Sequence, residues 1–128
     1  MDNCNFCLDN KTLKGEILLE NDCCYFVNSL DHVPEYAGMI ITKRHIENPF
    51  DIDNEEWLAI KEMLLEVKEL MDKYNPDGYN IGWNVGEVGG QVVPHSHLHV
   101  ALRFKDEPLA GKGIRYFFKQ ETNLRNNP

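Results

Sequence analysis

The stretch "GGQVVPHSHLHVALRF", residues 89–104, decides the fold, because it reads as a β-strand with two chemically different faces. Three histidines stand at every second position in it: His95, His97 and His99. Residues two apart on a strand point to the same face and lie about 6.6–6.8 Å apart along it. The residues of opposite parity are apolar from position 98 onward: Leu98, Val100 and Leu102. Residues 95–104 are therefore predicted to form a strand that packs with one face and presents three imidazoles on the other.

A glycine-bearing loop leads into this strand from residues 79–86, which read as the preceding strand of a hairpin. The loop brings glycines and uncharged amides close to the histidines: Asn84, Gly86, Gly89, Gly90 and Gln91. Glycines let backbone N–H groups approach a ligand closely, and amide side chains hydrogen-bond oxygen atoms without adding charge. A glycine loop beside a histidine row therefore indicates a binding site more strongly than either feature alone.

Three further strands and one long helix are predicted upstream. The strands cover residues 15–20, 24–29 and 38–45. Asp53 and Glu56 have the spacing of a helical capping box, and Pro76 ends the helix that follows. Apolar residues recur along this helix at three- and four-residue steps, which predicts one buried stripe: Trp57, Ile60, Leu64, Val67, Met71 and Tyr74. Strands in hairpin succession with one inserted helix predict an α+β fold, in which the helix covers one face of an antiparallel five-stranded sheet.

Length and charge narrow the class of protein. A chain of 128 residues is long enough for one domain with a buried core, and none of its apolar runs approaches the length of a membrane span. Its amino terminus lacks the basic and apolar segments of a secretion signal, so we expect a cytoplasmic protein. The net charge of −8 argues against binding of DNA or RNA polymers, although local donors can still bind a small phosphorylated ligand.

The histidine row has two functional interpretations and one neutral one. Three imidazoles can hold an open, catalytic metal ion. Alternatively, one ring attacks phosphorus while its neighbours donate hydrogen bonds to phosphate oxygens. The neutral interpretation is an exposed polar strand face, and the gathering of three of the chain's five histidines in this row argues against it.

The stretch "HSHLHVAL" (95–102) resembles the signature of the histidine triad (HIT) family, His-x-His-x-His followed by apolar residues. Three further stretches are similar to the same family: "NPDGYNIGWNVGEVGGQVVPH", "MIITKRHIENPFDI" and "CNFC". The resemblance covers about residues 4–104, and we interpret 1–128 as a single HIT domain with a carboxy-terminal extension over about 105–128. It implies a homodimeric nucleotide hydrolase or nucleotidyltransferase that acts at the α-phosphate of nucleotide phosphoramidates or dinucleoside polyphosphates.

The resemblance also implies a role for each triad member. His97, the central one, would be the nucleophile that forms a nucleotidyl-histidine intermediate, which water then hydrolyses. His99 would donate a hydrogen bond to a phosphate oxygen, and the carbonyl near His95 would fix the tautomer of the central ring. These roles suit a neutral imidazole, which is nucleophilic near pH 7.

Contacts to a purine nucleotide, AMP or a related compound, follow from the same resemblance. Asn84 would contact the phosphate or the leaving group, and Gly90 and Gln91 would lie beside it. Asn28 would bind the ribose, with Asp31 as a rival for that role.

Two departures from the family bear on the substrate. "EYAG" (35–38) stands where the family usually has Pro-Gly-His, which leaves the purine pocket undefined. Val92 stands where many relatives carry a Ser or Thr that assists the leaving group, so this help must come from backbone N–H groups, Gln91 or water. A catalytically weak nucleotide-binding module is therefore an alternative to the enzyme, and a metalloenzyme that uses the three histidines is another.

The amino-terminal cysteines have an interpretation of their own. Zinc-bearing relatives hold the metal with residues that correspond here to Cys4, Cys7, His45 and His95. Two thiolates and two imidazoles make a closed tetrahedral site, so the resemblance implies a structural zinc ion, and no organic cofactor is expected. Redox activity or free thiols are alternatives for a Cys-x-x-Cys pair. His32 belongs to no motif and is expected at the surface, and "GKGIRYFFKQ" (111–120) could reach a partner's site, as family tails sometimes do.

Overall fold

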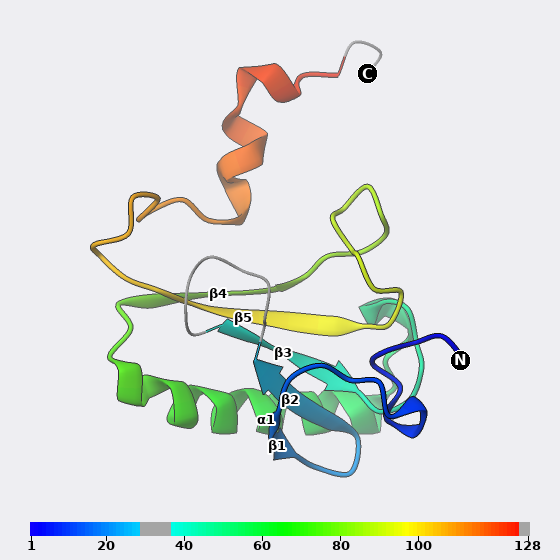
Figure 1. The fold of residues 1–128 in the computed structure, drawn as a ribbon. Coiled ribbons are helices and arrows are strands. Elements are labelled where there is room, and N and C mark those ends of the chain that lie inside the picture. Colours follow the sequence, from blue (N-terminus) through cyan, green and yellow to red (C-terminus); the bar gives the residue numbers. More distant parts are fainter. Residues whose placement is uncertain (29–36, 126–128) are drawn as a thin grey trace.

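The computed structural model describes residues 1–28 and 37–125 and shows in them one five-stranded antiparallel sheet (Figure 1). Its strands are β1 (Ile17–Glu20), β2 (Cys24–Asn28), β3 (Ala37–Thr42), β4 (Gly78–Trp83) and β5 (His97–Arg103). They lie in the order β1-β2-β3-β5-β4, with antiparallel neighbours throughout. The predicted α+β architecture is confirmed. Asp31 and His32 lie outside the described residues.

One long helix, α1 (Asn54–Met71), covers one face of the sheet (Figure 1). It begins with the predicted capping box: the Asp53 carboxylate accepts from the Glu56 backbone N–H at 2.8 Å, and the Glu56 carboxylate accepts from the Asp53 N–H at 3.0 Å. A short 3-10 turn, Asp72–Tyr74, and Asn75 in a left-handed conformation end it. Within the described part of the chain, no helix combines the length and the apolar character of a membrane span.

The main core lies between the sheet and α1. The strands contribute alternate residues to it: Cys24, Phe26, Ile40, Leu98, Val100 and Leu102. The predicted helical stripe is wrong at Trp57, which is 45% exposed, and it omits Met63, which is fully buried. Trp57 packs edge-on against Trp83 of the edge strand β4, with ring centroids 5.5 Å apart. It therefore covers the edge of the sheet instead of the core.

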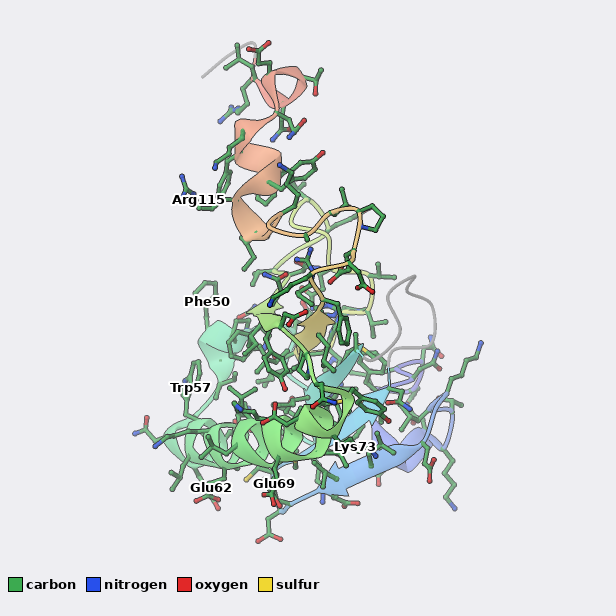
Figure 2. All side chains as sticks on the ribbon, turned by 90° about the vertical axis from the view of Figure 1, so that its left-hand side faces the viewer. Phe50, Trp57, Glu62, Glu69, Lys73 and Arg115 are labelled. Atoms are coloured by element: carbon green, nitrogen blue, oxygen red, sulfur yellow. The ribbon has the colours of Figure 1, made fainter. Side chains whose placement is uncertain are left out.

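The opposite face of the sheet is covered by irregular segments. The amino-terminal segment packs on β2 and β3, and together they form a second buried cluster: Cys4, Phe6, Cys7, Tyr25, Val27 and Ile41. The loop 84–94 and the carboxy-terminal segment also lie on this side of the sheet (Figure 1). The carboxy-terminal segment contains two 3-10 helices, Ile114–Lys119 and Glu121–Asn123, and projects away from the sheet in both views (Figures 1 and 2).

β3 ends earlier than predicted, and this difference sets the position of His45. The strand stops at Thr42, whose hydroxyl donates to the Arg44 carbonyl at 2.9 Å and so stabilises a turn. The Arg44 guanidinium then pairs with the Glu56 carboxylate of α1 at 2.6 Å. His45 therefore lies in a loop that is tied to the helix, and it is free of the sheet ladder.

β5 also begins later than predicted, so that His95 precedes the strand and only two triad members belong to it. The Ser96 backbone N–H donates to the Ile46 carbonyl at 2.6 Å, which holds the end of the loop against the segment after β3. β4 likewise ends at Trp83, before the predicted limit of 86. The loop between the two strands is correspondingly longer.

Candidate active site and metal-binding group

The central and last triad histidines lie on the sheet face opposite α1. In the ladder, His97 pairs with Ile41, and His99 lies between Met39 of β3 and Gly82 of β4. The two imidazole rings meet edge to face, with centroids 4.9 Å apart. His97 is only 6% exposed, so the row is not an exposed polar surface and the neutral interpretation is excluded.

Hydrogen bonding and burial define the state of the His97 ring. Its Nδ1 lies 2.7 Å from the His95 carbonyl oxygen. Because a carbonyl can only accept, Nδ1 carries the proton and Nε2 keeps an unprotonated lone pair. Burial lowers the pKa of His97, and the hydrogen bond to the carbonyl opposes this only in part. The ring is therefore neutral near pH 7, as a nucleophile has to be.

The His95 ring does not extend the row. It is fully buried, and its Nε2 donates to the Thr42 carbonyl at 2.6 Å, which leaves Nδ1 unprotonated and 3.3 Å from the Cys4 sulfur. Burial is the main reason that the pKa of His95 is lowered to about 4. The prediction that His95 belongs to the strand is wrong, because β5 begins at His97. The His95 ring lies on the same side of the sheet as His97, where it contacts the amino-terminal cysteines and Phe6.

Four side chains converge at this point, with all of their ligand atoms within 4.8 Å of one another: Cys4, Cys7, His45 and His95. The Cys7 sulfur lies 3.2 Å from His45 Nδ1, which in turn lies 3.2 Å from His95 Nδ1. The edges of a zinc tetrahedron with two sulfur and two nitrogen ligands are about 3.3–3.8 Å long, so the four ligand atoms lie close enough together to share one four-coordinate ion.

The two other triad members stand outside this converging group. Among residues 1–28 and 37–125, His97 and His99 belong to no cluster of three or more His, Cys, Asp or Glu side chains that could hold a metal. The geometry therefore does not support the three-histidine metalloenzyme.

The Cys7 thiol belongs to the converging group. Burial and the neighbouring Cys4 raise the pKa of this thiol, whereas a bound cation would lower it.

Gln91 braces the glycine loop. Its Oε1 accepts from the Gly86 backbone N–H at 2.9 Å, and its Nε2 donates to the carbonyls of Glu47 at 2.6 Å and Val93 at 3.1 Å. Gly86 and Gly90 have φ angles of +75° and +100°, conformations that are easily adopted only by glycine. The amide of Gln91 thus shapes the loop, whereas its contact with a nucleotide stays a prediction.

The remaining predicted contact residues are exposed and close to element ends. Asn84 follows β4 and donates to the Gly90 carbonyl at 3.5 Å. Asn28 is the last residue of β2, pairs with Gly38, and has the strand parity of the residues that face α1. Val92 is 89% exposed. This parity alone does not direct the Asn28 side chain to the triad, and its ribose contact stays a prediction.

A cavity of about 550 Å³ adjoins His99 and is bounded by β4, β5, the glycine loop and the carboxy-terminal segment. The carboxy-terminal segment lines it with four residues: Gly113, Ile114, Tyr116 and Phe117. No Asp, Glu, Lys or Arg is among the described residues that line the cavity. In the single chain, this segment lies beside the chain's own His99, and its approach to a partner's site stays a prediction. The run of aromatic residues in an otherwise polar tail is the sequence signal for this placement.

Comparison with known proteins agrees with the fold and the site. The HIT domain family matches residues 10–106. An adenosine 5'-monophosphoramidase of Candida albicans is 32% identical over 120 residues, which cover 87% of this chain and 76% of the relative. An uncharacterized HIT-like protein of Methanocaldococcus jannaschii is 28% identical over 107 residues, which cover 81% of each chain. The crystal structure of a HIT family protein from Bacillus anthracis superposes with a TM-score of 0.75 at 26% identity, over 82% of this chain and 76% of the other. The chain therefore belongs to the HIT family.

Proposed function

We propose that this HIT protein is a nucleotide hydrolase or nucleotidyltransferase whose nucleophile is Nε2 of His97. The observation that carries the proposal is the hydrogen bond from His97 Nδ1 to the His95 carbonyl, because it leaves the lone pair on the other nitrogen. Nε2 attacks the α-phosphorus and forms a phosphorus–nitrogen bond to His97. The bond between phosphorus and the leaving group breaks, and the leaving group takes up a proton from water as it departs. Water then attacks the same phosphorus, releases the nucleoside monophosphate and regenerates the imidazole.

The neighbouring groups would stabilise the phosphate during both steps. His99, whose ring centroid is 4.9 Å from that of His97, would donate a hydrogen bond to a non-bridging oxygen. Asn84, together with Gly90 and Gln91, would contact the phosphate or the leaving group from the glycine loop. Asn28 would bind the ribose.

We infer that the substrates are nucleotide phosphoramidates in preference to dinucleoside polyphosphates. The described lining of the cavity beside His99 contains no Lys or Arg, so it offers no cation to neutralise a polyphosphate leaving group. An amine leaving group needs no such cation. The name of the Candida albicans relative, an adenosine 5'-monophosphoramidase, points to the same substrate class.

We also propose that the converging cysteines and histidines hold a structural zinc ion. Bound zinc would supply a closed, four-ligand anchor with no open position for a substrate: Cys4, Cys7, His45 and His95. The hydrogen bond from His95 Nε2 to the Thr42 carbonyl orients the imidazole so that Nδ1 can act as the ligand atom.

A homodimer is the assembly that the surface supports. β4 has a neighbour on only one side, so its outer edge presents unpaired backbone groups. Large apolar side chains on α1, on β4 and near them are exposed: Phe50, Trp57, Leu58, Leu65 and Ile81. Figure 2 shows Phe50 and Trp57 on one side of the molecule. Light scattering should give twice the chain mass of 14.8 kDa, and a monomer at all concentrations would contradict the dimer.

The enzymatic proposal is tested by turnover of adenosine phosphoramidate. The wild-type protein should release AMP, and His97→Ala should abolish the release. His32→Ala removes a histidine outside the triad and should leave turnover unchanged. If neither the phosphoramidate nor a diadenosine polyphosphate yields AMP although nucleotide binds, the chain is a nucleotide-binding module and the enzymatic proposal fails.

A further inference from the structure

We infer that Phe6 is a positioning residue for His97, through which the metal-binding segment reaches the proposed nucleophile, and this inference rests on the proposed function. Phe6 stands between Cys4 and Cys7, so it is flanked on both sides by members of the converging group. The residue is only 9% exposed. The residue is therefore part of the packed environment of the triad and not of the surface.

The Phe6 ring lies directly against the histidines. Its centroid is 5.2 Å from that of His97 and 6.1 Å from that of His95, and both pairs meet nearly edge to face. This geometry is the favourable one for aromatic pairs. The Phe6 carbonyl accepts a hydrogen bond from the hydroxyl of the fully buried Tyr25 at 2.5 Å. Both the ring and the main chain of Phe6 are thus held in place.

His97 needs such a contact because its hydrogen bond alone does not fix the ring. The His95 carbonyl determines which nitrogen carries the proton, but rotation about the Cβ–Cγ bond of a histidine is only weakly restricted. Packing by Phe6 and by His99 limits this rotation. Without Phe6, the ring could turn, and water could compete for the Nδ1 proton. A small displacement of a nucleophile can reduce the rate by orders of magnitude.

The metal-binding group holds the chain on both sides of Phe6. The Cys4 sulfur lies 3.3 Å from His95 Nδ1, and the Cys7 sulfur lies 3.2 Å from His45 Nδ1. His95 acts twice, because its ring belongs to this group while its carbonyl accepts the hydrogen bond from His97. Release of the metal should therefore loosen both restraints on the His97 ring together.

The kinetic test compares metal-loaded Phe6→Ala and Phe6→Leu with Leu13→Ala, which shortens a partly buried side chain of the same cluster. With adenosine phosphoramidate, kcat should fall about 10- to 100-fold for Phe6→Ala and less for Phe6→Leu, while KM changes less than about 2-fold. Leu13→Ala should keep the wild-type kcat. A raised KM with unchanged kcat would overturn the inference, because that result marks a residue that binds the nucleotide.

A second measurement is independent of turnover. The ¹⁵N NMR signals of the ring nitrogens distinguish protonated from unprotonated nitrogen and so report the His97 tautomer. We expect the Nδ1-protonated form in the metal-loaded wild type, and exchange between tautomers in metal-loaded Phe6→Ala and in the wild type after chelation. Phe6→Leu replaces Phe6→Ala if the latter does not fold. Unchanged His97 signals would overturn the inference. Tautomer exchange in a protein that turns over no nucleotide would instead overturn only the proposed function.

Discussion

The two faces of the sheet are built from different kinds of contact. Toward α1, alternate strand residues and one side of the helix form a continuous apolar core. On the other face, an irregular segment carrying two cysteines covers one half (Figure 1). Over the other half, the glycine loop and the carboxy-terminal segment border a cavity beside His99. The helix side therefore mainly stabilises the fold, whereas the histidine side holds the proposed active site. Substitutions on the two faces should therefore have separable effects.

The largest expected effect on stability is on the helix side. Met63→Ala removes a fully buried side chain of α1, and we expect the free energy of unfolding to fall by about 2–5 kcal/mol. Urea denaturation measures this loss. The kcat of the folded variant should stay close to that of the wild type, since the residue packs away from the triad. A large fall in kcat at unchanged stability would show that the two faces are not separable.

Metal removal should have the next largest effect, on the histidine side. With free zinc at 100- to 1,000-fold its Kd, binding contributes about 3–4 kcal/mol to the free energy of unfolding, and chelation should remove this contribution. Cys7→Ser should lower the metal content from about one ion per chain. Cys23→Ser is the matched control, because Cys23 is outside the converging group. Metal retained by the first variant, or lost by the second, would contradict the assignment of the ligands.

A smaller effect is expected at the ion pair between Arg44, in the loop after β3, and Glu56 of α1. The hydrogen bond from Arg44 is the main reason that the pKa of Glu56 is lowered, and the Glu56 side chain is only 7% exposed. A lowered folded-state pKa means that the stabilisation is present above the pKa of glutamate in the unfolded chain. It is lost as the pH falls through the folded-state value.

Glu56→Gln tests this dependence on pH. At pH 7 the substitution should cost about 1–2 kcal/mol of unfolding free energy, and at about pH 3 the cost should be clearly smaller. Urea denaturation of both proteins at the two pH values gives the comparison. An equal cost at both values would mean that the charge on the carboxylate contributes nothing.

The smallest effect is expected at Val92, which is 89% exposed. Val92→Ser should change the free energy of unfolding by less than about 0.5 kcal/mol. Its hydroxyl could donate to a departing amine, so kcat should rise by about 2- to 5-fold for phosphoramidates of poorly leaving alkylamines. Little change is expected for substrates with good leaving groups. A uniform change across a series of leaving groups would argue against this role.

The helix side could be predicted from the sequence because its contacts are periodic. Strand alternation placed Leu98, Val100 and Leu102 in the core, and residue spacing identified the capping box at Asp53. Trp57 was wrongly assigned to the core and Met63 was left out of it, because spacing along a helix does not show where the sheet that it covers ends.

The histidine side could be predicted only in part. The resemblance to the family named the four residues that converge, but alternation wrongly extended the strand to His95, which precedes β5. The direction of its ring depends on Cys4, which is 91 positions away in the sequence, and no local pattern reports such a contact. The cavity beside His99 depends in the same way on the carboxy-terminal segment, whose placement no periodic pattern indicates.

Trapping of the covalent intermediate tests the central claim most directly. An active preparation is mixed with adenosine phosphoramidate, quenched during turnover, digested and analysed by mass spectrometry under conditions that preserve phosphorus–nitrogen bonds. We predict an adenylyl group on the peptide that contains His97, located on that residue by fragmentation and absent from His97→Ala. Full turnover with no adduct on His97, or a His97→Ala variant as active as the wild type, would contradict the account.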